Sequence, residues 1–206
     1  MNDLVALPLE MMARLIRDRE VSPVEVVEAH LERIAELNPA LNAIVTLAPD
    51  VLERAREAEA AAISGDQLGS LHGVPVTIKD TIETAGLRTT SGSVIRQDYV
   101  PQTDAPAVAR LKAAGAIVLG KTNAAEMAMD YTADNPVFGR TNHPLNAELT
   151  PGGSSGGEAV AIATECRHRE RASSALVVDD PVLTVERPLD LHRVPRIERR
   201  FKRIIN

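Results

Sequence analysis

The sequence has few aromatic residues and almost no cysteine. Its 206 residues include two Tyr, two Phe, no Trp and a single Cys. One Cys excludes an intrachain disulfide framework and a zinc site built from several cysteines. No apolar run approaches the ~18 residues of a membrane span, and no basic-then-apolar secretion signal opens the chain. With 44% hydrophobic and 25% charged residues, the chain is expected to be a globular cytoplasmic protein.

Glycine is missing from the C-terminal part of the sequence, and the charge balance changes sign in the same region. All 12 glycines lie between Gly65 and Gly157. Residues 1–163 carry 13 Lys and Arg against 22 Asp and Glu, whereas residues 164–206 carry 10 against 7. The two shifts predict two parts of different origin, with the boundary after Ala163.

The first sixty residues predict helices that pack together and carry no recognisable chemistry. Ser22, Pro23 and Glu25 form a capping box with proline at the first helical position. The helix that follows is expected to stop at Asn38 and Pro39. Further helices are expected over residues 9–19 and 50–62, with a short strand over 43–47 between the second helix and the third.

From Gly65 onward the pattern is typical of an α/β domain. Short apolar strands are expected over residues 74–78 and 116–119. Thr103 or Asp104 is expected to cap a helix over 105–114, which Gly115 closes, and another helix is expected to begin at Asn123. Because open α/β sheets place their sites at strand ends, the polar residues that follow the two strands are candidates for function.

Residues 115–122 (GAIVLGKT) fit the expression for a phosphate-binding P-loop. A P-loop needs its four intervening residues as an open loop that follows a strand and turns backbone N–H groups to phosphate. Here those four residues are apolar and are typical of a strand that follows a helix. The segment therefore favours a helix, a glycine and a strand over a nucleotide site.

Lys79 ends the apolar strand predicted over residues 74–78. A charged amine at such a place is costly unless it is paired or neutral, and a neutral amine can act as a general base. Pairing with Asp80 is the alternative interpretation. The residue type and its place leave both open.

The densest feature is the segment 151–158 (PGGSSGGE), in which four glycines surround Ser154 and Ser155. Glycines let the backbone lie close to a ligand, and serine hydroxyls both donate and accept, as a proton relay requires. A Gly/Ser linker is the alternative, but an apolar helix start follows directly. The five histidines are scattered without metal-ligand spacing, so no metal site is expected.

Taken together, these segments resemble the amidase signature family. The resemblance lies in residues 71–80 (LHGVPVTIKD), 86–92 (GLRTTSG), 120–123 (GKTN), 135–139 (NPVFG) and 151–157 (PGGSSGG), and covers about residues 5–163. It implies a truncated portion of an α/β/α sandwich with a mixed central sheet and N-terminal helices first. Residues 1–163 would be the N-terminal part of that domain, and residues 164–206 an unrelated basic tail.

The resemblance also implies a chemistry. Members of the family hydrolyse linear amides, or release ammonia from glutamine within an amidotransferase-type complex, through a Ser–Ser–Lys triad and without a cofactor. By resemblance Lys79 is the general base, Ser154 is the relay serine preceded by a cis peptide, and Ser155 is a supporting hydroxyl. Substrate contacts are implied at Met127, Ala128, Gly152 and Gly153, and the expected partner is a small-molecule amide.

The sequence departs from the family where the nucleophile is expected. In the family that serine lies about two dozen residues beyond the relay serine, in a Gly-Gly-Ser loop that also forms the oxyanion hole. Residues 175–180 (ALVVDD) hold no glycine or serine, and Ser173 and Ser174 stand in a segment without glycine. The chain is therefore expected to be inactive or nearly so by itself.

Three interpretations of the last 43 residues stay open. A frameshift or rearrangement after Ala163 explains their nine Arg, one Lys and lack of glycine. An active amidase would need a substitute nucleophile from this tail or from a second chain. A non-catalytic module would use the Gly-rich loop and the basic tail, but with Phe201 as the tail's one stacking aromatic, nucleic acid is not the expected partner.

Overall fold

The computed structural model describes residues 3–165 and 176–178 and has an α/β fold. Its longer helices are α1 (Leu9–Arg17), α2 (Pro23–Leu41), α3 (Val51–Ser64), α4 (Pro106–Ala113) and α5 (Gly156–Glu165). The strands are β1 (Ile44–Leu47), β2 (Pro75–Lys79), β3 (Ile117–Thr122) and β4 (Leu176–Val178). Three short 3₁₀ turns are η1 (Asp3–Ala6), η2 (Val94–Arg96) and η3 (Glu126–Ala128).

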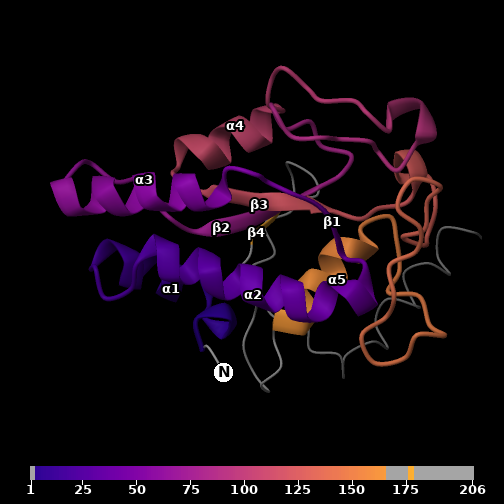
Figure 1. The fold of residues 1–206 in the computed structure, drawn as a ribbon, viewed down its shortest axis with the longest axis horizontal. Helices are drawn as coiled ribbons and strands as arrows, with labels where there is room; N and C mark the ends of the chain where they lie inside the picture. The colour runs from indigo at the N-terminus through magenta and orange to yellow at the C-terminus, as the bar shows by residue number, and fades with distance from the viewer. Residues whose placement is uncertain (1–2, 166–175, 179–206) are drawn as a thin grey trace, which may run out of the picture.

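The four strands form one mixed sheet in the order β1-β3-β2-β4. β2 runs parallel to both β3 and β4, and β1 runs antiparallel to β3. In Figure 1, α4 lies on one side of the sheet and α5 on the other. The main core packs the apolar side chains of β2 and β3 against α2, α3 and α4, and includes Val76, Ile78, Leu119, Val27, Ala55 and Val108. The fold is thus a portion of an α/β/α sandwich with N-terminal helices first, as expected.

The capping box at the start of α2 is confirmed. The Ser22 hydroxyl accepts from the Val24 N–H at 2.9 Å, and the Glu25 carboxylate accepts from the Ser22 N–H at 2.9 Å. Two backbone donors that the helix cannot use are satisfied in this way.

The prediction that α2 stops at Asn38 and Pro39 is wrong, because the helix continues to Leu41. Pro39 removes one N–H donor, but in the last turn of a long helix this costs a single hydrogen bond. The helix ends instead at Asn42, which adopts a left-handed conformation. Asn38 then joins the helix end to β1, since its side chain accepts from the Ile44 N–H at 2.8 Å.

The expected cap of α4 is also wrong. Ala105 occupies the N-cap position without a side-chain hydrogen bond, while the Asp104 carboxylate accepts from Lys112 at 2.8 Å and from the Ala85 N–H at 2.7 Å. A charged partner and a loop amide therefore draw the carboxylate away from the helix start. Similarly, only the short turn η3 forms after Asn123 instead of a longer helix.

The segment 115–122 is not a P-loop. Gly115 adopts a φ of +91° directly after α4, and a side chain there would clash with the backbone of His72. β3 then extends through Gly120 and Lys121 to Thr122, further than the predicted end at Leu119. The helix, glycine and strand architecture predicted for this segment is confirmed.

Candidate active site

Lys79 and Ser154 meet at the end of β2. Lys79 is the last residue of the strand and is 5% exposed. Its Nζ donates to the Ser154 Oγ at 2.8 Å, across 75 residues of sequence. The structure therefore brings together the amine and the hydroxyl that the sequence singles out. The carboxylate of Asp80, the alternative partner of Lys79, accepts from the Thr90 and Gly92 amides of the following loop.

The Gly-rich segment is an ordered turn into α5, not a linker. The peptide bond between Gly153 and Ser154 is cis, as the resemblance implies. A side chain at position 153 would lie 2.5 Å from the Tyr131 backbone and 2.6 Å from the Thr132 backbone, so glycine is required there. The Ser154 carbonyl accepts from the Ala125 N–H at 3.0 Å, which fixes the loop against the chain that follows β3.

Ser155 begins the hydrogen bonding of α5, since its carbonyl accepts from the Ala159 N–H at 3.1 Å. Met127 and Ala128 lie in the turn that contacts this loop through Ala125, and both have left-handed backbone angles. The Met127 N–H donates to the Ser91 carbonyl at 2.8 Å, and Met127 is 42% exposed. The turn with Met127 and Ala128 is thus joined to the Ser154 loop through the Ala125 N–H.

Two buried polar clusters were not predicted from the sequence. On the α5 side of the sheet, the Glu158 carboxylate accepts from Thr77 and Thr122. On the opposite face, Lys121 is fully buried and donates to the Ile82 carbonyl and to Thr84. The sequence does offer a signal for both clusters, since Thr77 and Lys121 are polar residues within apolar strands. Their partners could not be predicted, because Glu158 and Thr84 lie in distant segments of the chain.

The Lys121 cluster has strongly shifted ionisation. Burial lowers the pKa of Lys121 to about 8, against the opposing attraction of Asp80. Burial likewise raises the pKa of Asp80, although hydrogen bonds from Thr90 oppose the shift. Lys121 donates to Ile82 and Thr84, and Asp80 accepts from Thr90 and Gly92, so both side chains hold the loop 80–92 in place.

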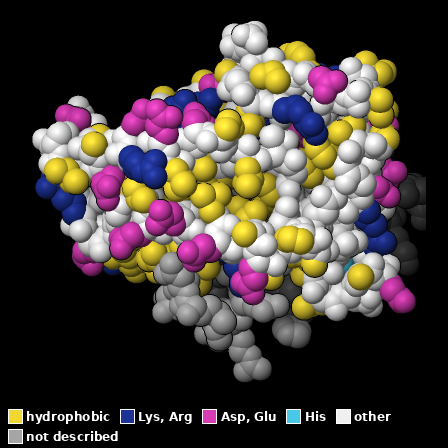
Figure 2. Space-filling model, viewed as in Figure 1, with side chains coloured by type: hydrophobic (Ala, Val, Ile, Leu, Met, Phe, Trp, Pro, Cys, Tyr) yellow, Lys and Arg dark blue, Asp and Glu magenta, His cyan; other side chains and the backbone are white. Residues whose placement is uncertain are grey.

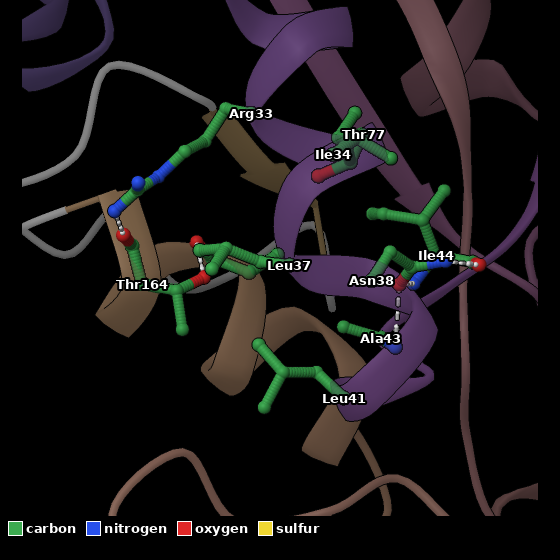
Figure 3. Close-up of a pocket in the computed structure, with 10 residues that line it drawn as sticks. Arg33, Ile34, Leu37, Asn38, Leu41, Ala43, Ile44, Thr77 and Thr164 are labelled. Atoms are coloured by element: carbon green, nitrogen blue, oxygen red, sulfur yellow. Dashed lines mark hydrogen bonds between the residues drawn. The ribbon is translucent and has the colours of Figure 1, made fainter. Parts of the chain in front are cut away.

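His30 and the hollow lined by α2, β1 and α5 are separate from this site. His30 is buried and its Nδ1 lies 2.8 Å from the Val26 carbonyl, and burial lowers its pKa. Among the described residues, no group of His, Cys, Asp and Glu could hold a metal ion. Figure 3 shows a hollow between α2, β1 and α5, where Arg33 donates to the Thr164 carbonyl at 2.7 Å. None of the predicted site residues lines it.

β4 lies beside β2 at the side of the sheet that carries Lys79. β4 pairs in parallel with β2, with Leu176 opposite Val76 and Val178 opposite Ile78. The two strands therefore end at the same edge of the sheet, where Lys79 lies. Ser173 and Ser174 lie outside the described residues.

Comparison with known proteins identifies the family. The model of the Amidase family matches residues 25–167, more than half of the sequence.

The chain belongs to the amidase family.

Its curated relatives in this family are longer proteins. A glutamyl-tRNA(Gln) amidotransferase subunit from Acidothermus cellulolyticus is 43% identical over 164 residues, which is 79% of this chain and 32% of the relative. The indoleacetamide hydrolase of Bradyrhizobium diazoefficiens is 44% identical over 152 residues, 73% of this chain and 29% of the relative. This amidase-family chain spans about a third of the length of the curated relatives that it matches.

Solved structures agree with this assignment. The peptide amidase of Stenotrophomonas maltophilia superposes with a TM-score of 0.72 at 36% identity, covering 76% of this chain and 34% of that one. A bacterial aryl acylamidase of the amidase signature enzymes superposes with a TM-score of 0.74 at 29% identity, covering 79% and 34%. Within the described part of the chain, no helix has the length and apolar character needed to cross a membrane.

Proposed function

We propose that this chain carries the base and relay half of an amide-hydrolysing site. In this proposal Lys79 is the general base, Ser154 relays the proton, and Ser155 supports the relay with a second hydroxyl. The 2.8 Å contact between Lys79 Nζ and Ser154 Oγ carries the proposal. A neutral amine at that distance can accept the Ser154 proton, and Ser154 can then take one from an attacking nucleophile.

The neighbours of this pair supply the proposed substrate contacts. The backbone at Gly152 is open to close approach, since a side chain there would meet no atom within 4 Å, and Gly153 precedes Ser154 through the cis peptide bond. The turn with Met127 and Ala128 lies against Ser154 through the Ala125 amide and presents the half-exposed Met127. We assign these four residues to an amide substrate and infer no cofactor for the reaction.

The other half of the site is absent from the sequence, so the lone chain hydrolyses amides slowly or not at all. From Asp179, directly after β4, to the last residue the sequence contains no glycine and no serine. Loss of a serine nucleophile costs about 10⁶ in rate, and loss of one oxyanion donor costs a further ~10²–10³. If the chain acts in a complex, the relatives that are named as amidotransferase subunits point to one of that type.

A chimera tests the roles of Lys79 and Ser154. Residues 1–163 would be joined to the remaining part of the Bradyrhizobium indoleacetamide hydrolase, and ammonia released from indoleacetamide would be measured. The folded chimera is expected to be active, and Lys79→Ala and Ser154→Ala are each expected to lower kcat by about 10³ or more.

The control is Lys112→Ala, which removes a lysine that pairs with Asp104 away from the site. This variant is expected to keep the chimera's kcat. A folded chimera without activity, or one that stays active after Lys79→Ala, would contradict the proposed roles.

A further inference from the structure

The carboxylate of Glu158 joins α5 to the two central strands. Glu158 is 2% exposed. Oε1 accepts from the Thr77 hydroxyl at 2.7 Å, and Oε2 accepts from the Thr122 hydroxyl at 2.8 Å. Burying a carboxylate is costly unless hydrogen bonds compensate it, so a carboxylate held in this way is a specific feature of the fold.

Glu158 lies on the same face of the sheet as Lys79. Side chains two residues apart on a strand share a face, so Thr77 and Lys79 point the same way. Thr122 lies opposite Lys79 in the parallel register of β2 and β3. The contacts agree, because Lys79 reaches Ser154 just before α5, and the two threonines reach Glu158 in the first turn of α5.

The first turn of α5 also packs closely against the backbone that follows β3. The Gly157 N–H donates to the Asn123 carbonyl at 3.0 Å. A side chain at position 157 would lie 2.5 Å from the Asn123 nitrogen and 2.6 Å from the Ala43 oxygen. Only glycine allows this approach, and the Glu158 carboxylate then fixes the next residue of the helix to both strands.

We propose that Glu158 is a positioning residue for the Lys79–Ser154 pair. By anchoring the first turn of α5 to Thr77 and Thr122, it holds the Ser154 Oγ within hydrogen-bond distance of the Lys79 Nζ. The inference rests on the proposed function in that it names a support for the same pair. Glu158 acts through Ser154 and does not touch the substrate.

The test measures how accessible the Lys79 amine is, with no need for enzymatic turnover. The full chain would be treated with acetic anhydride, and the rate of acetylation at each lysine would be followed by mass spectrometry. Glu158→Leu keeps the side-chain volume but removes both acceptors, and is expected to raise the Lys79 rate about fivefold, the factor that one lost hydrogen bond corresponds to. Glu158→Gln still offers both threonines a polar partner, and is expected to stay within about twofold of the wild type.

A double-mutant cycle separates positioning from general loosening. Ser154→Ala removes the hydroxyl to which Lys79 donates and sets the largest expected increase. If Glu158 acts through Ser154, then Glu158→Leu adds little to Ser154→Ala. The acetylation rates of Lys112 and Lys121 serve as internal references. Thr89→Val is the matched control variant, because it also removes a buried hydroxyl, one that donates to the Leu87 carbonyl.

Two results would overturn the inference. One is a Lys79 rate within about twofold of wild type in folded Glu158→Leu. The other is a parallel rise at Lys79, Lys112 and Lys121, which would indicate general loosening. If Glu158→Leu does not fold, Thr122→Val takes its place, and the same two results at Lys79 would overturn the inference. Thr122→Val removes one hydroxyl that donates to Glu158 and leaves the carboxylate itself. Because acetylation reports the placement of Lys79, an inactive chimera would count against the proposed function and leave this result intact.

Discussion

Two lysines on neighbouring strands are buried on opposite faces of the sheet. Lys79 ends β2 and donates to Ser154 on the α5 side, while Lys121 of β3 lies opposite Ile78 and points to the other face. The end of an apolar strand points to Lys79, and the resemblance implies its role as the base. The partners of Lys121 could not be assigned from the sequence, because Ile82 and Thr84 belong to a loop about forty residues earlier.

The lowered pKa of Lys121 predicts a pH-dependent stability. The folded chain releases this proton near pH 8, whereas an unfolded lysine holds it to about 10.4. The unfolded state therefore binds more protons between these values, and stability rises with pH. Relative to Lys121→Met, the wild-type free energy of unfolding is expected to increase by about 2 kcal/mol from pH 7 to 9.5.

Urea denaturation of both proteins at several pH values measures this difference. Asp80, Asp104 and Glu83 attract the charged amine and oppose the shift, while Lys112 adds to it. Wild-type and Lys121→Met stabilities that change in parallel over the range would show that the pKa of Lys121 is not lowered.

At the scale of elements, the predictions that held rest on local signals. The start of α2 could be predicted because Ser22, Pro23 and Glu25 act within one turn. The end of α2 could not be predicted, because the effect of Pro39 depends on how far the helix extends. The start of α4 could not be predicted either, because the Asp104 carboxylate accepts from Lys112 and from the Ala85 N–H and does not cap the helix. The contacts of Glu158 likewise require two strands to be paired first.

The capping box gives a stability prediction for α2. Ser22→Ala removes the acceptor of the Val24 N–H and is expected to cost about 1 kcal/mol of unfolding free energy. Ser64→Ala, at the exposed end of α3, is the matched control and is expected to change the stability by less than about 0.5 kcal/mol. Equal losses for the two variants in urea denaturation would contradict the role of the cap.

The close packing of α5 against the end of β3 gives a second prediction. Gly157→Ala places a methyl group 2.5 Å from the Asn123 nitrogen and is expected to destabilise the fold by about 1–3 kcal/mol. In the same helix, Ala159→Ser, at an exposed position, is expected to cost no more than about 0.7 kcal/mol. Thermal unfolding followed by circular dichroism compares them, and a Gly157→Ala variant as stable as Ala159→Ser would show that the helix can move aside.

At the scale of the whole molecule, the family and the fold class could be recognised from the sequence, because the motifs are ordered along residues 5–163. The family model ends at residue 167, and α5 ends at Glu165. On the face that Figure 2 shows, acidic side chains are more common than Lys and Arg over α2 and α3. Such a face repels the phosphate backbone of nucleic acids.

We propose that a frameshift or rearrangement follows Ala163 and accounts for the glycine-free, Arg-rich residues 164–206. Translation of the other two reading frames of the gene downstream of codon 163 is expected to reveal a Gly-Gly-Ser segment and the remainder of an amidase. If neither frame encodes such a segment, the frameshift is excluded.

In the proposed function, Lys79 and Ser154 are in place while the nucleophile is not. Ammonia released by the purified 206-residue chain from glutamine and simple amides tests it most directly, with Lys79→Ala measured in parallel. The predicted result is no release above that of the Lys79→Ala variant. Turnover by the wild-type chain that Lys79→Ala abolishes would contradict the claim and show that another residue serves as the nucleophile.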